Sequence, residues 1–381
     1  MRTIHPALRA MMALCSIGLV GLAGCGDDGG TKPLPGEAPP CGRVLVVTTD
    51  YNTGSICVID ADSSYQSYPD LTSIHPDAVA RYEEGLVYVV NRLGADNVQV
   101  LDPADGMRTL RQFSVGPGTN PHDIALVAQD RAYVARYGSV DLLEVDPRTG
   151  ARRDSISLAR FADADGLPEM DRLFYRAPYL YVSLQRIDFD GAYLPVPPSM
   201  IAVIDTRTND LVDADPAVSG TQAIALAGLN PSAPMVWDES RLVLLVPETG
   251  RYGLLDAGVE RVDLAMMRPA GWLTREEQLG GDLIDFALSP TGRGYATISD
   301  PASITSLVEF DPGTGVRMST LHTSDGYELA DLTVTGCGQI LVCDMDYEAP
   351  GLRAYDAATG TETAGRIETG LRPFELILLN P

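Results

Sequence analysis

Positively charged residues are scarce in this 381-residue sequence. It contains 28 lysines and arginines against 52 aspartates and glutamates, which gives a formal net charge of −24. A surface with such an excess of carboxylates repels the phosphate backbone of nucleic acids, so the sequence argues against DNA or RNA as a partner. Solubility alone is enough to explain the charge, and no acid-specific role is needed.

Residues that commonly carry catalysis are also few. The chain has four histidines, and the Gly-x-Ser-x-Gly, His-Glu-x-x-His and Gly-Lys-Ser/Thr motifs are absent from it. His75 and His122 are the two histidines that we expect near a loop-rich face, and His122 is the general base that an enzyme of this sequence would use. The sequence therefore favours a binding protein over an enzyme.

Long apolar runs are missing after residue 25, which argues against a membrane-spanning helix there. Before that point, Arg2 and Arg9 precede the apolar segment Ala10–Val20, which is too short to cross a bilayer. This is the pattern of a secretory signal, and we expect residues 1–24 to be removed from the mature protein.

The signal segment ends in Leu22-Ala23-Gly24-Cys25, which resembles a bacterial lipobox. The resemblance implies that Cys25 is lipidated and becomes the new N-terminus, while ordinary signal cleavage without a lipid is the alternative. Residues 25–42 would then be a flexible tether, because they contain almost no core-forming side chains. We expect a lipid-anchored protein of the bacterial cell envelope that touches the membrane only through its lipid. Gly26, rather than aspartate, favours the outer membrane by resemblance to enterobacterial sorting rules.

The rest of the sequence is built from repeats. A short apolar strand recurs seven times, at Arg43–Val47, Leu86–Val90, Arg131–Ala135, Tyr179–Ser183, Arg241–Leu245, Arg293–Thr297 and Gln339–Cys343. A second strand follows each and ends in aspartate, at Asp60, Asp102, Asp146, Asp205, Asp256, Asp311 and Asp356. The aspartate spacings of 42 to 59 residues suit a four-stranded propeller blade. We interpret the aspartates as turn residues, because aspartate bonds the backbone two residues further on.

A third strand precedes most repeats, and the chain also ends on one. The first repeat lacks such a strand, whereas residues 373–379 form one with nothing after it. The sequence therefore predicts an all-β fold, a seven-bladed β-propeller over residues 43–381. Residues 373–379 would close the ring by supplying the inner strand of the blade begun by residues 43–72, which removes exposed sheet edges.

The second repeat reads Val87-Tyr88-Val89-Val90-Asn91, followed by a strand that ends at Asp102. This pattern resembles the YVTN-type seven-bladed propellers of bacterial and archaeal cell surfaces. The resemblance extends over roughly residues 43–379 and implies the fold, while its motifs specify no ligand. The architecture is also similar to that of phosphogluconolactonase-like propellers, which implies a lactonase-like hydrolase as the alternative activity.

Four cysteines remain after Cys25, and they allow three disulfide connectivities. Cys41 and Cys337 occupy the same place in adjacent repeats, so they are expected to pair across the closure of the ring. The same alignment pairs Cys57 with Cys343, because bridges within one repeat would span about 20 Å. Free buried thiols are the alternative.

Ligand sites on propellers collect where loops enter the inner strands. The candidates on that face are Asn91, Arg92, His122, Asp123, Arg136, Tyr137, Arg186, Asp344, Asp346, Arg372 and Glu375. Arginines from blades 2 to 4 and carboxylates from blades 6, 7 and 1 could together hold a ligand with an anionic and a polar group. The alternative is that these charges pair with one another.

Asp163, Asp165, Gly166 and Glu169 resemble half of a calcium-binding loop, with alternate acids, a turn glycine and a further carboxylate. The sequence leaves two interpretations open, a Ca²⁺ site at Asp163, Asp165 and Glu169 or a plain Asp-Gly turn.

The combined hypothesis is a lipid-anchored envelope propeller that acts as a binding or interaction scaffold through its loop-rich face. Its partner would be an envelope protein, a glycan or a small polar ligand. Two alternatives are a lactonase-like hydrolase that uses His122 and a structural adhesin or assembly component.

Overall fold

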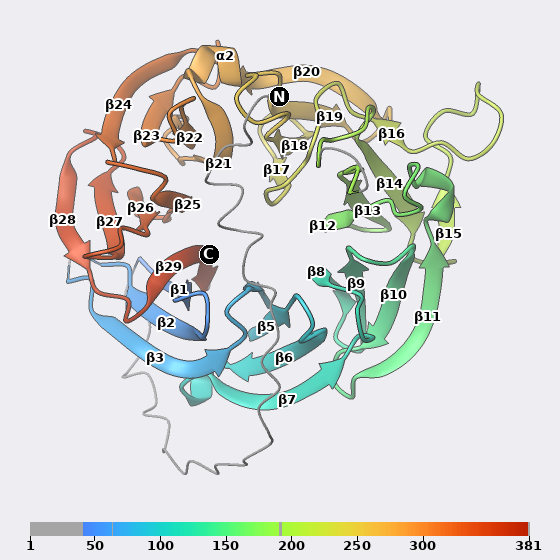
Figure 1. Ribbon diagram of the computed structural model, residues 1–381, viewed down its shortest axis with the longest axis horizontal. Helices are drawn as coiled ribbons and strands as arrows, with labels where there is room; N and C mark the ends of the chain where they lie inside the picture. The colour runs from blue at the N-terminus through green and yellow to red at the C-terminus, as the bar shows by residue number, and fades with distance from the viewer. Residues whose placement is uncertain (1–40, 63, 190–192, 380–381) are drawn as a thin grey trace.

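The computed structural model describes residues 41–62, 64–189 and 193–379. They form seven β-sheets arranged as the blades of a ring, which confirms the predicted seven-bladed propeller (Figure 1). The expected signal peptide, the lipidated Cys25 and nearly all of the tether lie outside the described residues. Within the described part of the chain, no helix is long and apolar enough to cross a membrane.

Each blade has four consecutive strands in meander order, except that blade 1 takes its inner strand from the C-terminus. Blade 1 consists of β29 (Arg372–Leu379), β1 (Arg43–Thr49), β2 (Gly54–Asp60) and β3 (Ser67–Ile74). Blade 2 consists of β4 (Ala78–Glu83), β5 (Leu86–Asn91), β6 (Asn97–Asp102) and β7 (Arg108–Ser114). Blade 3 consists of β8 (Pro121–Ala128), β9 (Arg131–Arg136), β10 (Asp141–Asp146) and β11 (Ala151–Ser157). Blade 4 consists of β12 (Met170–Arg176), β13 (Tyr179–Leu184), β14 (Met200–Asp205) and β15 (Asp210–Val212), and β16 (Ile224–Ala225) also pairs with β14.

The remaining blades follow the same plan. Blade 5 consists of β17 (Val236–Asp238), β18 (Val243–Glu248), β19 (Gly258–Asp263) and β20 (Arg268–Arg275). Blade 6 consists of β21 (Asp282–Leu288), β22 (Gly294–Ser299), β23 (Thr305–Phe310) and β24 (Arg317–Thr323). Blade 7 consists of β25 (Leu329–Val334), β26 (Gln339–Asp344), β27 (Gly351–Asp356) and β28 (Glu362–Ile367). Among the residues that the structure describes, three short helical segments lie in connections between strands: η1 (Pro103–Asp105), η2 (Ala159–Phe161) and α2 (Glu276–Leu279).

The core lies between neighbouring blades. The second and third strands of a blade are covered on both faces, so β1 and β2 read as nearly continuous runs of buried residues. The fourth strand lies on the outside, and β11 exposes all but one of its residues. One apolar cluster joins Val44 and Ile59 of blade 1 to Leu341 and Leu352 of blade 7. Face-to-face packing of the blades explains why the second and third strands of a blade show no alternation of apolar and polar residues.

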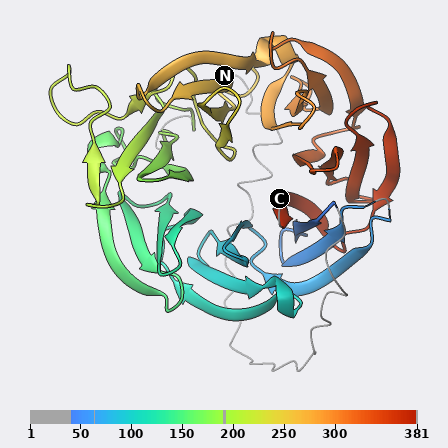
Figure 2. The ribbon, with the colours of Figure 1, turned by 180° about the vertical axis from the view of Figure 1, so that it is seen from behind.

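The ring closes as the sequence predicts. β29 pairs antiparallel with β1, with Val46 opposite Leu376, and it completes the sheet that β2 and β3 continue. Figure 2 shows the same junction from behind, with the C-terminal strand beside the N-terminal ones. Because both chain ends contribute to one sheet, β1 is paired on both of its sides and is not left as an open edge.

The disulfide across this junction is also confirmed, but the second predicted bridge is wrong. Cys41 and Cys337 are bonded, with their Cα atoms 5.3 Å apart. Cys57 and Cys343 are free, buried thiols. Both thiols belong to the apolar cluster between blades 1 and 7, where Cys57 pairs with Val46 of β1, but no bond joins them. The sulfur of Cys57 lies 3.5 Å from the hydroxyl of Ser67 on the outermost strand.

The aspartates after the third strands form turns, as expected. Asp146, for example, accepts a hydrogen bond from the backbone N–H of Arg148 at 3.0 Å. Blade 5 departs from the predicted register, because β19 ends at Asp263 and Asp256 lies in the loop before that strand. Asp263 makes the turn instead, accepting from the backbone N–H of Ala265 at 2.9 Å.

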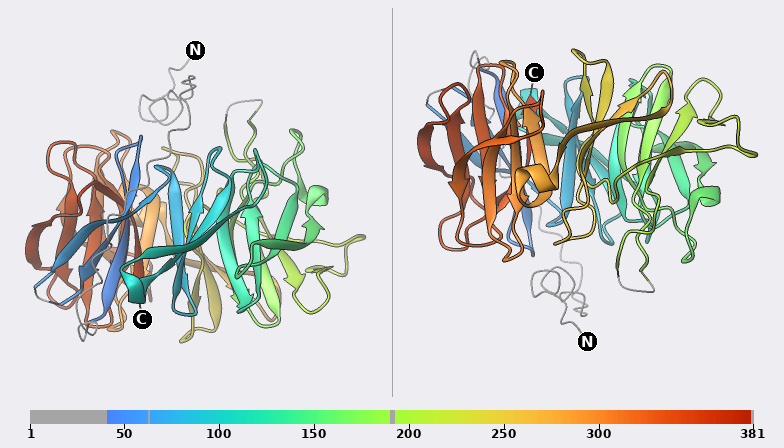
Figure 3. Two further views of the ribbon diagram at one scale, coloured as in Figure 1. Left: turned by 90° about the horizontal axis from the view of Figure 1, so that it is seen from below. Right: turned by 90° about the horizontal axis from the view of Figure 1, so that it is seen from above.

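The ring has two faces that carry loops, which Figure 3 shows from the side. We call the face where the chain enters each inner strand the entry face. The second strand of every blade runs antiparallel to the inner strand and therefore ends on the same face, as the pairing of Pro121 with Arg136 shows. Side chains at the start of one strand and just past the end of the next can thus meet on the entry face.

Candidate functional site

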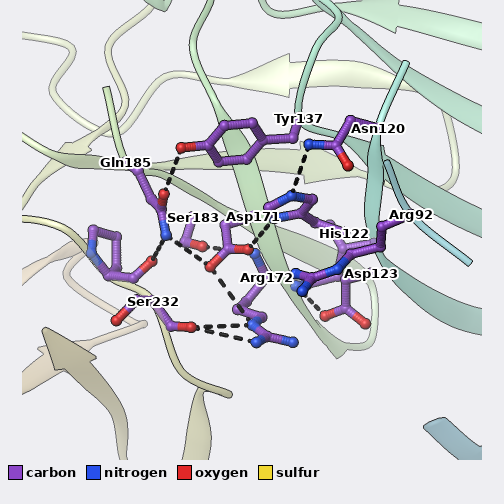
Figure 4. Close-up of polar contacts among 12 residues, drawn as sticks. Arg92, Asn120, His122, Asp123, Tyr137, Asp171, Arg172, Ser183, Gln185 and Ser232 are labelled. Carbon is purple, nitrogen blue, oxygen red and sulfur yellow. Dashed lines mark hydrogen bonds and ion pairs between the residues drawn. The ribbon is translucent and has the colours of Figure 1, made fainter. Parts of the chain in front are cut away.

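Four side chains from blades 3 and 4 meet on the entry face (Figure 4). His122 is the second residue of β8 and Asp171 is the second residue of β12, so both lie where an inner strand begins. Tyr137 and Gln185 directly follow β9 and β13, which end on this face. Because neighbouring blades repeat the same path, the four positions converge beside the axis of the ring.

His122 is held between two polar partners. Its Nδ1 atom lies 2.7 Å from Oδ1 of Asp171, and its Nε2 atom lies 3.2 Å from the amide nitrogen of Asn120. The amide orientation is fixed because the oxygen of Asn120 accepts from the backbone N–H of Leu93 at 3.1 Å. A carboxylate accepts and an amide nitrogen donates, so the proton sits on Nδ1 and Nε2 is the acceptor. Burial lowers the pKa of His122 even though Asp171 opposes this, which keeps the imidazole neutral.

A tyrosine and a glutamine complete a closed circuit of contacts around the histidine. The ring of Tyr137 stacks on His122, with centroids 4.1 Å apart and planes 18° from parallel. The hydroxyl of Tyr137 donates to Oε1 of Gln185 at 2.8 Å, and the amide nitrogen of Gln185 donates to Oδ2 of Asp171 at 3.0 Å. Burial raises the pKa of Tyr137, so its hydroxyl remains a donor at neutral pH.

Two further aromatic rings extend the stack outward. Phe189 packs edge-on to Tyr137 at 6.0 Å, and Tyr193 packs edge-on to Phe189 at 5.6 Å. Both belong to the long connection between β13 and β14, and both are largely exposed, at 39% and 45% of their surface. An aromatic path therefore leads from solvent to the buried histidine.

Two arginines near His122 each have a buried nitrogen that donates no hydrogen bond. Nε and Nη2 of Arg172 both donate to the carbonyl of Ser232 at 3.3 Å, but Nη1 is buried without a hydrogen-bond partner. Arg92 donates through Nη2 to Asp77, and its Nε is likewise buried and unpaired. Both guanidinium groups are close enough to help lower the pKa of His122. Buried N–H groups without partners are costly, and an acceptor oxygen from a ligand would satisfy them.

Carboxylates on the inner strands link neighbouring blades around the axis. Asp123 accepts from the backbone N–H of Leu173 in the next blade at 2.8 Å, and Glu375 accepts from that of Ala80 at 2.8 Å. Arg81 bridges these two acids, 2.8 Å from Asp123 and 3.6 Å from Glu375. Despite this arginine, burial raises the pKa of Glu375 to about 6. Asp123 and Glu375, both sequence candidates for ligand binding, thus also hold the ring together.

The other sequence candidates have partners within the protein. Arg136 donates to the backbone carbonyls of Asp141 and Val115, and Asn91 donates to Asn97 and Gln99. Asp344 pairs with Arg353 at 2.7 Å, Asp346 lies 3.4 Å from Arg366, and Arg372 stacks over Tyr51 and Tyr347. These contacts occupy much of their polar surface, so ligand binding by them stays a prediction.

The acidic loop of the sequence analysis lies next to this site. Carboxylate oxygens of Asp163, Asp165 and Glu169 come within 4.8 Å of one another. Burial and the neighbouring Asp165 raise the pKa of Glu169 to about 8. Arg186, on the facing connection, donates to the carbonyl of Pro198 at 2.8 Å. The structure therefore gathers the three acids, as the calcium interpretation requires.

Sequence reasoning assigned His122 and Tyr137 to the entry face but missed their partners. Asp171, Asn120 and Arg172 are the main omissions. A signal for Asp171 and Arg172 exists in the repeat, because Met170-Asp171-Arg172 occupies the same place in blade 4 as Pro121-His122-Asp123 in blade 3. An alignment of the inner strands alone would have placed the acid next to the histidine.

Comparison with known proteins identifies the fold. The chain matches no protein-family model, and no curated protein sequence matches it. The dihydro-heme d1 dehydrogenase NirN, solved in complex with DHE, is 18% identical over 91% of this chain and 77% of its own, with a TM-score of 0.59. A putative 6-phosphogluconolactonase from Bacteroides fragilis is 15% identical over 89% of this chain and 98% of its own, also with a TM-score of 0.59. Apo AztD from Citrobacter koseri is 13% identical over 88% and 96%, with a TM-score of 0.51.

Proposed function

We propose that this chain is a lipid-anchored propeller of the bacterial cell envelope that binds a small anionic molecule on its entry face, beside His122. The observation that carries the proposal is the pair of buried, unpaired guanidinium N–H groups of Arg92 and Arg172 next to a neutral imidazole. A carboxylate or phosphate oxygen would satisfy both arginines. The faces of His122 and Tyr137 and the exposed ring of Phe189 would hold the less polar part of the ligand.

Binding can be tested with sugar acids, which combine a carboxylate or phosphate with a hydroxylated body. We expect gluconate or 6-phosphogluconate to bind with measurable heat in isothermal titration calorimetry, and Arg92→Gln and His122→Ala to weaken binding at least tenfold. Arg207→Gln is the matched control, because Arg207 pairs with Asp205 on the surface. Absence of binding to either acid at millimolar concentration, together with no co-purifying small molecule in native mass spectrometry, would refute the proposal.

A hydrolytic activity at the same place is the second candidate. His122 has the geometry of a general base, with Nδ1–H fixed by Asp171 and Nε2 as the basic atom. In lactone hydrolysis, Nε2 would take a proton from water as its oxygen attacks the carbonyl carbon, and the proton would pass to the ring oxygen as the C–O bond breaks. The similarity in fold to a putative 6-phosphogluconolactonase makes sugar lactones the substrates to test. Turnover that survives His122→Ala, or no turnover across a lactone panel, would remove this candidate.

The envelope location rests on the sequence around Cys25 and on the resemblance to YVTN-type surface propellers. Metabolic labelling with a palmitate analogue tests it directly. We expect the label on the wild-type protein and none on Cys25→Ser, with Cys15→Ser as the control because Cys15 belongs to the expected signal peptide. Labelling of the Cys25→Ser variant would contradict the anchor. Crosslinking in intact envelopes would then separate a small-molecule receptor from a protein or glycan adhesin.

A further inference from the structure

The three acids between blades 3 and 4 have the separation of ligands around one cation. Asp163 and Asp165 lie in the loop after η2, and Glu169 immediately precedes β12. One carboxylate oxygen from each comes within 4.8 Å of the other two. Oxygens bind Ca²⁺ at about 2.4 Å, so two ligands on opposite sides of the ion are about 4.8 Å apart. All three oxygens therefore fit in a single coordination sphere.

A second, independent observation points to a ligand at this place. Glu169 is completely buried, yet its Oε1 atom has no hydrogen-bond partner, and Oδ2 of Asp163 is also buried and unpaired. The other oxygens of these acids are used by the backbone. Asp163 accepts from the N–H of Asp165 at 3.2 Å, Asp165 from that of Leu167 at 2.9 Å, and Glu169 from that of Ile187 at 3.1 Å. Backbone contacts thus hold one oxygen of each carboxylate, while Oε1 of Glu169 and Oδ2 of Asp163 remain without a hydrogen-bond partner.

No side chain of the described residues neutralises the three carboxylates by direct contact. Arg186 influences both Asp163 and Glu169 electrostatically, but among the described residues it forms no ion pair with either acid. Its Nη1 donates to the carbonyl of Pro198 instead. A buried carboxylate normally has a paired charge or a metal ion. A cation from outside the chain would satisfy these carboxylates directly.

We propose that Asp163, Asp165 and Glu169 bind a calcium ion, with backbone carbonyls and water completing its coordination. The donor set contains only oxygen, which suits a hard cation and disfavours zinc. An irregular loop tolerates the flexible coordination of Ca²⁺ better than the near-ideal octahedron of Mg²⁺. The two interpretations of the sequence are compatible, because Gly166 forms the turn with a positive φ of 89° while the acids flanking it face inward.

Calcium binding can be measured on EDTA-treated protein by isothermal titration calorimetry and by thermal unfolding. The wild type should bind one ion and melt at least about 3 °C higher in excess CaCl₂. Glu169→Gln should abolish both effects, and it should melt no lower than the wild type in EDTA because glutamine places no charge at this buried position. Asp165→Asn, at a less buried position, provides a second test should Glu169→Gln fold poorly. Asp215→Asn is the control, because Asp215 forms an exposed turn of the same type.

The outcomes discriminate clearly between a cation site and a plain turn. No calcium-dependent heat or thermal shift at millimolar concentration would overturn the proposal, as would full calcium binding by both Glu169→Gln and Asp165→Asn. Equal stabilisation by MgCl₂ would overturn the assignment to calcium. Arg186→Gln removes the nearby positive charge and should tighten calcium binding several-fold, whereas weaker binding would contradict an ion at this position. None of these measurements depends on the ligand proposed for the His122 site.

Discussion

His122 donates its Nδ1 proton to Asp171 across the boundary between two blades, over 2.7 Å. The two residues are far apart in sequence and occupy the same position in consecutive inner strands. Their contact is favoured by the repeat itself, which places consecutive inner strands next to one another. This geometry places the neutral imidazole of His122 against the buried carboxylate of Asp171.

The protonation state of His122 is the first prediction. Burial lowers its pKa, so the folded protein keeps the ring neutral at a pH where the unfolded chain, with an ordinary value near 6.5, has begun to bind a proton. The contribution of His122 to stability is therefore lost as pH falls through about 6.5. NMR titration of labelled histidine should give a pKa for His122 below the ordinary value of 6.5, with a neutral Nδ1–H tautomer. A pKa above 6.5 would show that Asp171 outweighs burial.

The cysteines provide a second prediction. Denatured but unreduced protein should show two reactive thiols among Cys41, Cys57, Cys337 and Cys343, and the native protein should show none. The Cys41→Ser variant should lose about 2–4 kcal/mol of unfolding free energy, because the bridge joins residues 296 apart and holds the closure of the ring. Dithiothreitol should reduce the stability of the wild type to that of the variant. Four reactive thiols in the denatured, unreduced protein would contradict the Cys41–Cys337 bridge. No reactive thiol would instead show that Cys57 and Cys343 are also bonded.

Two buried glutamates in blade 5 lead to a third prediction. Glu248 and Glu260 are both completely buried on adjacent strands. Burial, and then the charge of Glu260, raise the pKa of Glu248, and burial also raises the pKa of Glu260. The folded pair therefore retains a proton where the unfolded carboxyls have ionised. The stability of the wild type should fall as pH rises from about 5, by roughly 1.4 kcal/mol for each unit of pKa shift.

Substitution by glutamine isolates this effect. Glu248→Gln imitates the protonated acid, so it should cost little at pH 5 and should be more stable than the wild type at pH 9. Urea unfolding at both pH values provides the measurement, with the exposed Glu277→Gln as the control. A variant that loses the same stability at both pH values would show that the pair is ionised and accommodated in some other way.

Much of the fold was available from the sequence, because the repeat is carried by apolar strands and turn aspartates. The ring closure and the Cys41–Cys337 bridge depend only on which blades are neighbours, and both are confirmed. The errors concern register. Cys57 lies one residue from its expected position, and Asp256 was aligned where Asp263 makes the turn. Such shifts leave the apolar repeat recognisable, so sequence periodicity alone could not detect them.

The site was less accessible to sequence reasoning, for a related physical reason. Repeat position places His122 and Tyr137 on the entry face, but the partner of a charged side chain depends on its exact direction. Asp344, for instance, pairs with Arg353 on the neighbouring strand of its own blade. Such ion pairs engage charged side chains that, from the sequence alone, would be expected to be available to a ligand. The unpaired donors of Arg92 and Arg172 become visible only when every other partner has been placed.

The last prediction concerns the arginine shared by two blades. Arg81 lies between the buried carboxylates of Asp123 and Glu375, and these acids also bind backbone N–H groups of the next blade. The Arg81→Met variant keeps most of the side-chain volume but leaves both acids without a cation, and it should lose about 3–5 kcal/mol at pH 8.

The pH dependence of this loss identifies its cause. Without Arg81 the pKa of Glu375 should rise further, so the variant should regain part of its stability at pH 5, where protonation removes an unpaired charge. Arg207→Met, which breaks an ion pair at a side chain that is 65% exposed, should have only a small effect at either pH. Urea unfolding of both variants at pH 5 and pH 8 makes the comparison. If Arg81→Met behaves like Arg207→Met, the ring is held by its apolar blade interfaces alone, and the axial charges contribute to binding rather than to stability.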